Sequence, residues 1–284
     1  MDVGKFKYLS NLMSYSGFCL NPEEMLLIEN SLIILKHEQK FEKIFFWGKI
    51  HTTTSHDYYI AFGYKKDCLR DRRFFYSQDA IEWNSLPKPD QSVLETTLMC
   101  NEMFNGDPGL VLDVKRPPKF IAEDDLIIQG HERVINKLKE EQRLACVVKL
   151  ISDSAMLVPR GALYNPVNGI VTFNPTFTGL NRNEAIELKN YQIYREPEMK
   201  YNYNLLKRQN YNYSTDFLDT LDAIIPVNKS FSVTWERDEE IVVVRSLHWL
   251  GAAFLHEINE PCHMFFYMGD GKLNHDVLFM TANM

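Results

Sequence analysis

Two histidines and an aspartate lie close together in FFWGKIHTTTSHDYYIAFGYK, residues 45–65. His51 and His56 are five positions apart, and Asp57 follows the second histidine. Imidazole and carboxylate groups bind zinc, but a zinc site takes at least three protein ligands. Ligand pairs on one strand sit two positions apart and those on one helix three or four, so this pair needs a third ligand from a distant segment. We therefore predict a polar hairpin loop between two apolar strands.

The richest set of donor groups lies in HEINEPCH, His256–His263. Two histidines, one cysteine and two carboxylates fall within eight positions there. Such a set would suit metal-assisted hydrolysis, in which a bound metal ion activates a water molecule. Asn259 and Pro261 favour a connection between two strands instead, because both residue types are common in turns. The connection is the preferred interpretation, and the hydrolase stays open as the alternative.

Other patterns associated with catalysis or ligand binding are incomplete. The chain has no GxGxxG or GxxxxGK[ST] phosphate loop and no GxSxG nucleophile motif. Glu196 and Glu198 would suit a glycosidase, but the proline between them favours an extended surface turn. The run Arg72–Tyr76 would suit base stacking, but a net charge of −7 argues against nucleic-acid binding. We predict no catalytic residue, no cofactor-binding residue, no metal ligand and no cofactor.

Composition places the chain among ordinary folded proteins. It has 284 residues, of which 45% are hydrophobic and 24% charged, and this length suits one large domain or two smaller ones. Its five cysteines are scattered without a CxxC pair, which indicates reduced, intracellular thiols. The sequence shows no secretory leader and no run of about 20 apolar residues. We therefore expect neither export nor a membrane span.

Helices are predicted before residue 41 and strands after it. Residues 2–16 and 22–40 have helical periodicity, and Asn21-Pro22-Glu23-Glu24 has the residue types of a helix start. KIFFWGKI and DYYIAFGY, joined by six polar residues, predict a β-hairpin. RRFFYS and AIEWNSL continue the strand pattern, and residues 92–104 return to helical spacing. The aromatic strands are expected to pack on a pleated face.

The middle of the chain is predicted to alternate between loop, helix and strand. Residues 113–130 are expected to form a loop and Glu132–Arg143 a surface helix. RLACVVKLI and AMLVP predict two strands around Ser152-Asp153-Ser154. Short helices are predicted from Asn181 to Tyr191 and after Ser214, with an exposed loop over residues 201–213.

The last 55 residues have the strongest strand signal. Phe231, Val233 and Trp235 alternate with polar residues, and three further apolar runs follow. This pattern predicts an antiparallel meander, with Asp270-Gly271 as a hairpin turn. The fold class is therefore α+β: N-terminal helices packed on an antiparallel β-sheet, with a C-terminal antiparallel β-meander. We expect a single domain over residues 1–284, with sub-regions 1–112 and 120–284.

Several segments resemble, in the same order, the radial spoke head proteins of motile cilia and flagella, and most closely the short radial spoke head protein 9 family. They are FWGKI…DYYIAFG, RRFFYSQDAIEWNSLP, FNGDP, RLACVVKLISDSAMLVPRGALY, TFTGLNRNEAIELKNYQIYREP, TDFLDTLDAIIP and VVVRSLHWLGAAFLHE. The resemblance extends over roughly residues 21–280. It departs at Trp249-Leu250-Gly251, where the family tends to have Trp-Pro-Gly, and at Val277-Leu278-Phe279, where it has a Leu-Pro-Phe segment.

The resemblance implies a structural, non-catalytic subunit of the radial spoke head, located in the cytoplasm in the axoneme of a cilium or flagellum. It implies hetero-oligomeric assembly with the longer paralogous head subunits, transient contact with central-pair projections and a part in regulating dynein-driven motility. Neither a nucleic acid nor a membrane is expected as a partner. Two alternatives remain at this point: the metal-assisted hydrolase at His256–His263, and a small-ligand or peptide-binding module that uses the aromatic hairpin.

Overall fold

The computed structural model describes residues 1–115, 121–123, 126–128, 135–198 and 209–281. At its centre lies an eight-stranded mixed sheet with the order β13-β14-β15-β16-β1-β2-β3-β4. The strands are β1 (Lys43–Ile50), β2 (Tyr58–Tyr64), β3 (Arg73–Ser77), β4 (Asn84–Ser85), β13 (Phe231–Glu236), β14 (Ile241–Ser246), β15 (Ala252–Glu257) and β16 (His263–Gly269). The predicted α+β class, aromatic hairpin and C-terminal meander are confirmed.

Strands β1 and β16 join the two predicted sheet regions into one sheet. They run parallel, with Gly48 opposite Tyr267 and Ile50 opposite Gly269. A parallel pair needs a long connection between its strands, and here most of the chain separates β1 from β16. The region predicted as a second sheet is therefore continuous with the aromatic hairpins. The division into sub-regions stays a prediction.

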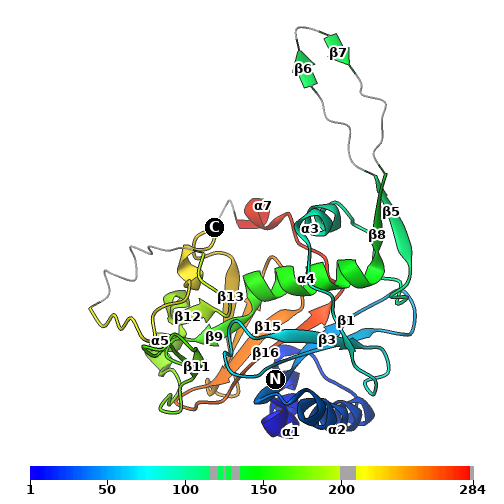
Figure 1. The fold of residues 1–284 in the computed structure, drawn as a ribbon. Helices are drawn as coiled ribbons and strands as arrows, with labels where there is room; N and C mark the ends of the chain where they lie inside the picture. Colours follow the sequence, from blue (N-terminus) through cyan, green and yellow to red (C-terminus); the bar gives the residue numbers. More distant parts are fainter. Residues whose placement is uncertain (116–120, 124–125, 129–134, 199–208, 282–284) are drawn as a thin grey trace.

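Both faces of the sheet are covered around its central strands, which explains why β2, β15 and β16 are almost entirely buried. Alternate side chains of a strand point to opposite faces. In β2, Tyr58, Ile60 and Phe62 pack on the face that carries α4 (Glu140–Ala155), whereas Tyr59 and Ala61 pack on the opposite face. Figure 1 shows α4 on one side of the sheet and the N-terminal helices on the other.

The N-terminal helices follow the sequence prediction closely. Residues 3–16 form η1 (Val3–Lys5), α1 (Phe6–Met13) and η2 (Ser14–Ser16), and the left-handed Gly17 ends this helical segment. Helix α2 (Pro22–Gln39) begins at the predicted capping box, in which Asn21 and Glu24 satisfy each other's backbone N–H groups. It ends at Lys40, which has a positive φ of 55°. The predicted helix of residues 22–40 is confirmed.

Helix α4 corrects the largest error of the sequence analysis. RLACVVKLI was predicted to be a strand, with a turn at Ser152-Asp153-Ser154, but α4 continues through both. Leu144, Val148, Ile151 and Ala155 are buried against the sheet at helical spacing. Strand β9 (Leu157–Pro159) follows and pairs with β12 (Tyr191–Ile193), so the AMLVP strand is confirmed.

The segment before α4 forms a two-stranded ribbon, where a loop and a helix were predicted. β5 (Val111–Lys115) pairs with β8 (Ile135–Lys139). Residues 113–115 were predicted as the start of a loop, and residues 135–139 as part of the helix Glu132–Arg143. Figure 1 shows this ribbon rising from the body of the molecule. β6 (Ile121–Glu123) pairs with β7 (Leu126–Ile128). The ribbon is held by backbone pairing between strands distant in sequence, which local helical propensity does not reveal.

Shorter predicted elements are partly wrong. Helix α3 (Gln91–Leu98) ends before the predicted limit at residue 104. The predicted helix of residues 181–191 divides into α5 (Arg182–Ala185), η3 (Leu188–Asn190) and the first residue of β12. Where a short helix was predicted directly after Ser214, the structure has the single turn η4 (Leu221–Ala223). Asp270-Gly271 leads to α7 (Val277–Thr281) rather than to a hairpin partner. The predicted loop 201–213 lies outside the described residues up to 208, and residues 209–213 are exposed where described.

Candidate functional site

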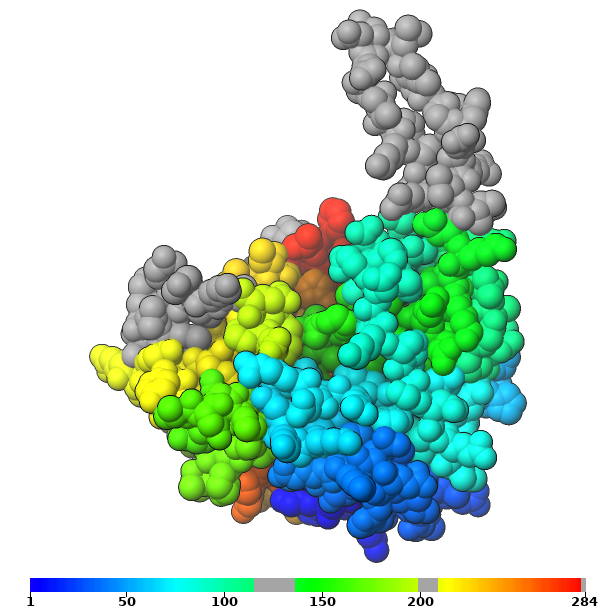
Figure 2. Space-filling model, in the orientation of Figure 1, coloured from blue at the N-terminus to red at the C-terminus, as the bar shows by residue number. Residues whose placement is uncertain are grey.

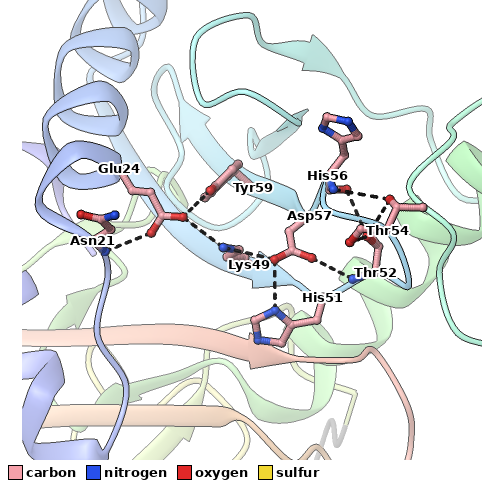
Figure 3. A network of polar contacts seen from close by, with 9 residues as sticks. All are labelled: Asn21, Glu24, Lys49, His51, Thr52, Thr54, His56, Asp57 and Tyr59. Carbon is pink, nitrogen blue, oxygen red and sulfur yellow. Dashed lines mark hydrogen bonds and ion pairs between the residues drawn. The ribbon is translucent and has the colours of Figure 1, made fainter.

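The loop between β1 and β2 carries a network of polar contacts (Figure 3). Asp57 accepts a hydrogen bond from the Thr52 backbone N–H at 2.9 Å, and its other oxygen lies 3.2 Å from Lys49 Nζ and 3.3 Å from His51 Nδ1. The ring of His56 points away from His51 in the same view. The two histidines therefore do not converge on one point, and the predicted polar hairpin loop is confirmed.

Lys49 connects this loop to the first turn of α2. Its Nζ lies 3.1 Å from Glu24 Oε1, which also accepts a 2.6 Å hydrogen bond from the Tyr59 hydroxyl. Burial opposes ionisation of Glu24, but hydrogen bonds from Tyr59, the Asn21 backbone and Lys49 outweigh it and hold the Glu24 pKa below its usual value. Burial likewise lowers the Lys49 pKa, but its carboxylate partners outweigh this and raise it. One cation between two carboxylates positions α2 against the sheet.

The sheet itself separates the donor groups of HEINEPCH. His256 and His263 are cross-strand neighbours in β15 and β16 and contact the aromatic rings on the α4 face. Glu257 points to the opposite face, where both its oxygens accept from the Tyr8 hydroxyl of α1 at 2.6 and 2.7 Å. Cys262 packs on that same opposite face. The side chains that looked like one cluster in sequence therefore lie on two sides of a β-sheet.

Each histidine of this pair is also engaged by protein groups. The Tyr191 hydroxyl lies 2.7 Å from the Ala185 carbonyl and 2.9 Å from His256 Nε2, and His256 Nδ1 lies 3.2 Å from the Glu257 carbonyl. His263 Nδ1 lies 3.0 Å from the Pro261 carbonyl. Burial lowers the pKa of both imidazoles to about 4. In the described part of the chain, no group of three or more His, Cys, Asp or Glu side chains is placed to hold a metal ion.

The remaining candidates are also separate in space. Glu196 pairs with Arg70 at 2.6 Å, whereas Glu198 lies 3.3 Å from Arg195, so the two carboxylates serve different cations. The Arg72 guanidinium stacks over the Tyr194 ring at 4.7 Å. The aromatic side chains of the hairpin are buried within the two faces of the sheet, and this set includes Phe46, Trp47, Tyr58, Tyr59, Phe62 and Tyr64. Phe45 of the same hairpin is partly buried, and it lines a pocket of about 260 Å³ together with Phe173 and His263.

Helix α2 exposes an apolar face that the sequence analysis missed. Ile28, Leu32 and Leu35 form an inner stripe that is buried. A second set of aliphatic side chains lies outside this stripe, namely Leu26, Leu27, Ile33 and Ile34, with exposed fractions between 42% and 61%. A helix that is apolar on all sides is normally buried. The signal was present in MLLIENSLIILK, which has aliphatic residues on every side of the helix.

A groove runs between this face of α2 and the turn that precedes β4. Leu27 and Ile34 form one wall, and Ile81 and Trp83 form the other; the groove has a volume of about 520 Å³. Ile34 and Ile81 are 59% and 57% exposed. The charged residues that line the groove are both acidic, Glu38 and Glu82. Figure 2 shows α2, in blue, at the surface in the lower part of the view.

Comparison with known proteins shows the relationship of the chain. No protein-family model matches it. Over 281 residues it is 36% identical to the radial spoke head protein 9 homolog of Danio rerio, covering 99% of this chain and 100% of that protein. The chain belongs to the radial spoke head protein 9 family. The homologs of Bos taurus and Homo sapiens are 34% and 33% identical over 280 residues, with the same coverage.

Membership in the radial spoke head protein 9 family confirms the resemblance stated from the ordered segments. In this family member, Asp57, His256 and His263 are engaged in ion pairs, hydrogen bonds and aromatic packing. No described helix is long and apolar enough to cross a membrane. The exposed apolar face of α2 is one described feature that internal packing leaves unexplained.

Proposed function

We propose that this chain is a non-catalytic structural subunit of the radial spoke head in the axoneme of motile cilia or flagella. In this role it assembles with the longer paralogous head subunits and helps relay central-pair signals that regulate dynein-driven motility. The proposal is supported by similarity to proteins named radial spoke head protein 9 homologs along 99% of the chain. It places the protein in the cytoskeleton of the cilium.

The observation that carries the proposal is the exposed apolar face of α2 with its groove. Contiguous apolar patches on a soluble protein mark contact sites, because water solvates them poorly. The α2 face presents four aliphatic side chains, and the groove adds Ile81 and Trp83. The acidic pair Glu38 and Glu82 makes the groove complementary to a basic partner. We infer that the occupant is an amphipathic helix of another head subunit, with lysine or arginine beside its apolar stripe.

Co-expression with the longer head subunits tests the proposal. The wild-type chain is expected to be recovered with at least one of them in a stable complex. Ile34→Asp is expected to reduce recovery at least tenfold, because a charge at the centre of an apolar contact costs more than about 1.4 kcal/mol. Ile186→Asp is the matched control, since Ile186 is 56% exposed but lies away from α2.

The outcomes of this experiment distinguish an error in the proposed function from an error in the proposed contact surface. A wild-type chain that captures no head subunit contradicts the proposed function. A wild-type complex that tolerates Ile34→Asp as well as Ile186→Asp shows that another surface makes the contact. Both variants should first show the melting temperature of the wild type, since neither residue is buried.

The net negative charge of the chain supports a second contact of the proposed subunit, with the central-pair projections. The chain carries a net charge of −7. We infer that its acidic surface contributes to transient, salt-dependent contact between the spoke head and central-pair projections. Reversal of exposed acidic side chains is expected to weaken that contact and alter motility. Unchanged contact and motility after reversal would count against it.

A further inference from the structure

A small pocket lies between the C-terminal end of α3, helix α4 and the segment that follows β16. Its volume is about 170 Å³. Val147 and Leu150 of α4 and Trp249 supply apolar walls, and Cys100 lies beside them. Drug-sized ligands occupy pockets of roughly 300–1,000 Å³. This pocket therefore has room for a small group and a few carbon atoms. It plays no part in the contact surface proposed above.

A buried arginine with unused hydrogen-bond donors lines this pocket. Arg143 is only 2% exposed. Its Nη2 donates to the Glu102 carbonyl, and its guanidinium carbon lies 4.3 Å from the centroid of the Phe104 ring. Its Nε and Nη1 have no hydrogen-bond partner. Among the described residues, no carboxylate oxygen is a partner of either atom.

Such a group is costly without a counter-charge. Burying a cation away from water is unfavourable unless it is paired and hydrogen-bonded. The contact with Phe104 offsets part of that cost, because the face of an aromatic ring attracts a cation. It does not provide acceptors for the two unused N–H positions. An oxyanion would provide both, since guanidinium binds carboxylate and phosphate through parallel N–H···O bonds.

The charges around Arg143 favour the same class of ligand. Lys272 and His275 line the pocket from the segment after β16, and no aspartate or glutamate lines it. This pocket is positive in a chain whose net charge is −7. An anion that approaches it therefore meets a local field opposite in sign to that of the protein as a whole.

We propose that this pocket binds a small oxyanion, a carboxylate or phosphate group, whose oxygens accept hydrogen bonds from Arg143 while the apolar walls hold a short hydrocarbon body. The proposal does not depend on the function in the spoke head. It assigns Arg143 as the central ligand-binding residue and Lys272 as an electrostatic contributor at the rim. Side-chain shifts of Arg143 toward the ligand are part of the expected response.

Two probes distinguish the two sources of the oxyanion. The purified full-length chain is titrated calorimetrically with inorganic phosphate and with butyrate, at constant ionic strength, against chloride. Saturable binding of phosphate alone identifies a phosphoryl site, and binding of butyrate alone or of both identifies a carboxylate-accepting site. The absence of saturable binding for both probes overturns the proposal.

Two cysteines locate the binding within the molecule. Cys100 lines the pocket and is half-buried, whereas Cys19 is exposed and lies outside it. A saturating concentration of the probe that binds, phosphate or butyrate, is expected to slow the alkylation of Cys100 by iodoacetamide at least threefold, as measured by peptide mass spectrometry. The alkylation rate of Cys19 should stay unchanged. Calorimetric binding without selective protection of Cys100 places the ligand elsewhere and also overturns the proposal.

Substitutions test the role of each cation. Arg143→Gln is expected to abolish binding. Lys272→Ala changes an exposed side chain and is expected to weaken binding about threefold, the scale of a partly solvated charge contact. Lys66→Ala, an exposed control away from the pocket, should bind like the wild type. If Arg143→Gln does not fold, the Lys272→Ala affinity and the Cys100 protection decide the matter. Equal affinity of the Lys272 and Lys66 variants, without protection of Cys100, refutes the assignment.

Discussion

Replacing Gly48 with alanine is expected to break the junction on which the central sheet depends. Gly48 lies in β1 opposite Tyr267 of β16, with a φ of 149°. A Cβ atom at this position would lie 2.1 Å from the Tyr267 carbonyl oxygen and 2.7 Å from its nitrogen. Both contacts are with backbone, so no side-chain rotation relieves them. The two strands must separate, or β1 must change its backbone conformation.

The expected cost follows from the contacts that separation would remove. The parallel register comprises three residue pairs, from Gly48 with Tyr267 to Ile50 with Gly269. Loss of two or three of their hydrogen bonds costs about 2–3 kcal/mol, at about 1 kcal/mol each. Backbone strain at this φ adds about 1–3 kcal/mol. Gly48→Ala should therefore lower the free energy of unfolding by about 3–6 kcal/mol, a large part of the 5–15 kcal/mol typical of proteins.

Urea denaturation, followed by tryptophan fluorescence and far-ultraviolet circular dichroism, measures this loss. Gly169→Ala is the matched control, because Gly169 also has a positive φ of 74° but a Cβ there meets no atom within 4 Å. The free energy of unfolding of the control should fall by only about 1 kcal/mol, because its added Cβ causes left-handed backbone strain alone. If Gly48→Ala lowers the free energy of unfolding no more than Gly169→Ala does, β1 and β16 do not approach each other closely, and the sheet is not continuous across them.

Three further outcomes follow from the described geometry. Burial lowers the pKa of His256 from 6.5 to about 4, so between these pH values the unfolded state binds more protons than the folded state. The free energy of unfolding should therefore fall by about 3 kcal/mol from pH 6.5 toward pH 4. His256→Gln should remove this contribution to the fall, as measured by urea denaturation at a series of pH values. Lys49→Met should cost about 1–3 kcal/mol at pH 7, because it leaves Glu24 and Asp57 without their shared cation. Since the pKa values of both carboxyl groups are lowered in the folded state, the wild-type contribution should begin to decline below about pH 4, where these groups become protonated in the unfolded state, and should be lost as the pH falls through their folded-state pKa values. A loss from Lys49→Met that does not decrease at any acid pH would refute this. Residues 1–112 expressed alone should remain unfolded by circular dichroism, because β1 would lack β16; a folded fragment would support independent sub-regions.

The sequence was most informative where local chemistry determines the element. The Asn21 capping box and the alternating pattern of β13 each depend on neighbouring residues, and both predictions were confirmed. Helix α4 was missed because it is buried on several sides. Ala145, Cys146 and Val147 fill the gaps between its inward-facing residues, so the segment reads as a continuous apolar run. A run of this kind does not distinguish a buried strand from a buried helix.

The donor clusters show a different limit of sequence reasoning. Successive side chains of a strand point to opposite faces of the sheet, so residues that are adjacent in sequence are separated by the sheet. His256 and Glu257 are adjacent, but one contacts Tyr191 beside α4 and the other contacts Tyr8 of α1. Conversely, the pocket around Arg143 combines residues from positions 97 to 275. No local motif could indicate it, because the fold alone brings these segments together.

Helix α2 illustrates how one element can separate folding from assembly. Its inner face contributes Ile28, Leu32 and Leu35 to the core, so alanine at those positions should cost about 2–5 kcal/mol each. Its outer face is solvated in the isolated chain, so polar substitutions at Leu26 or Ile34 should change stability by no more than about 0.5 kcal/mol. If the outer face binds another head subunit, those same substitutions must weaken the complex strongly. A surface that is neutral for folding yet essential for assembly is what distinguishes a docking face from incidental exposure, and a complex insensitive to them would assign the outer face no such role.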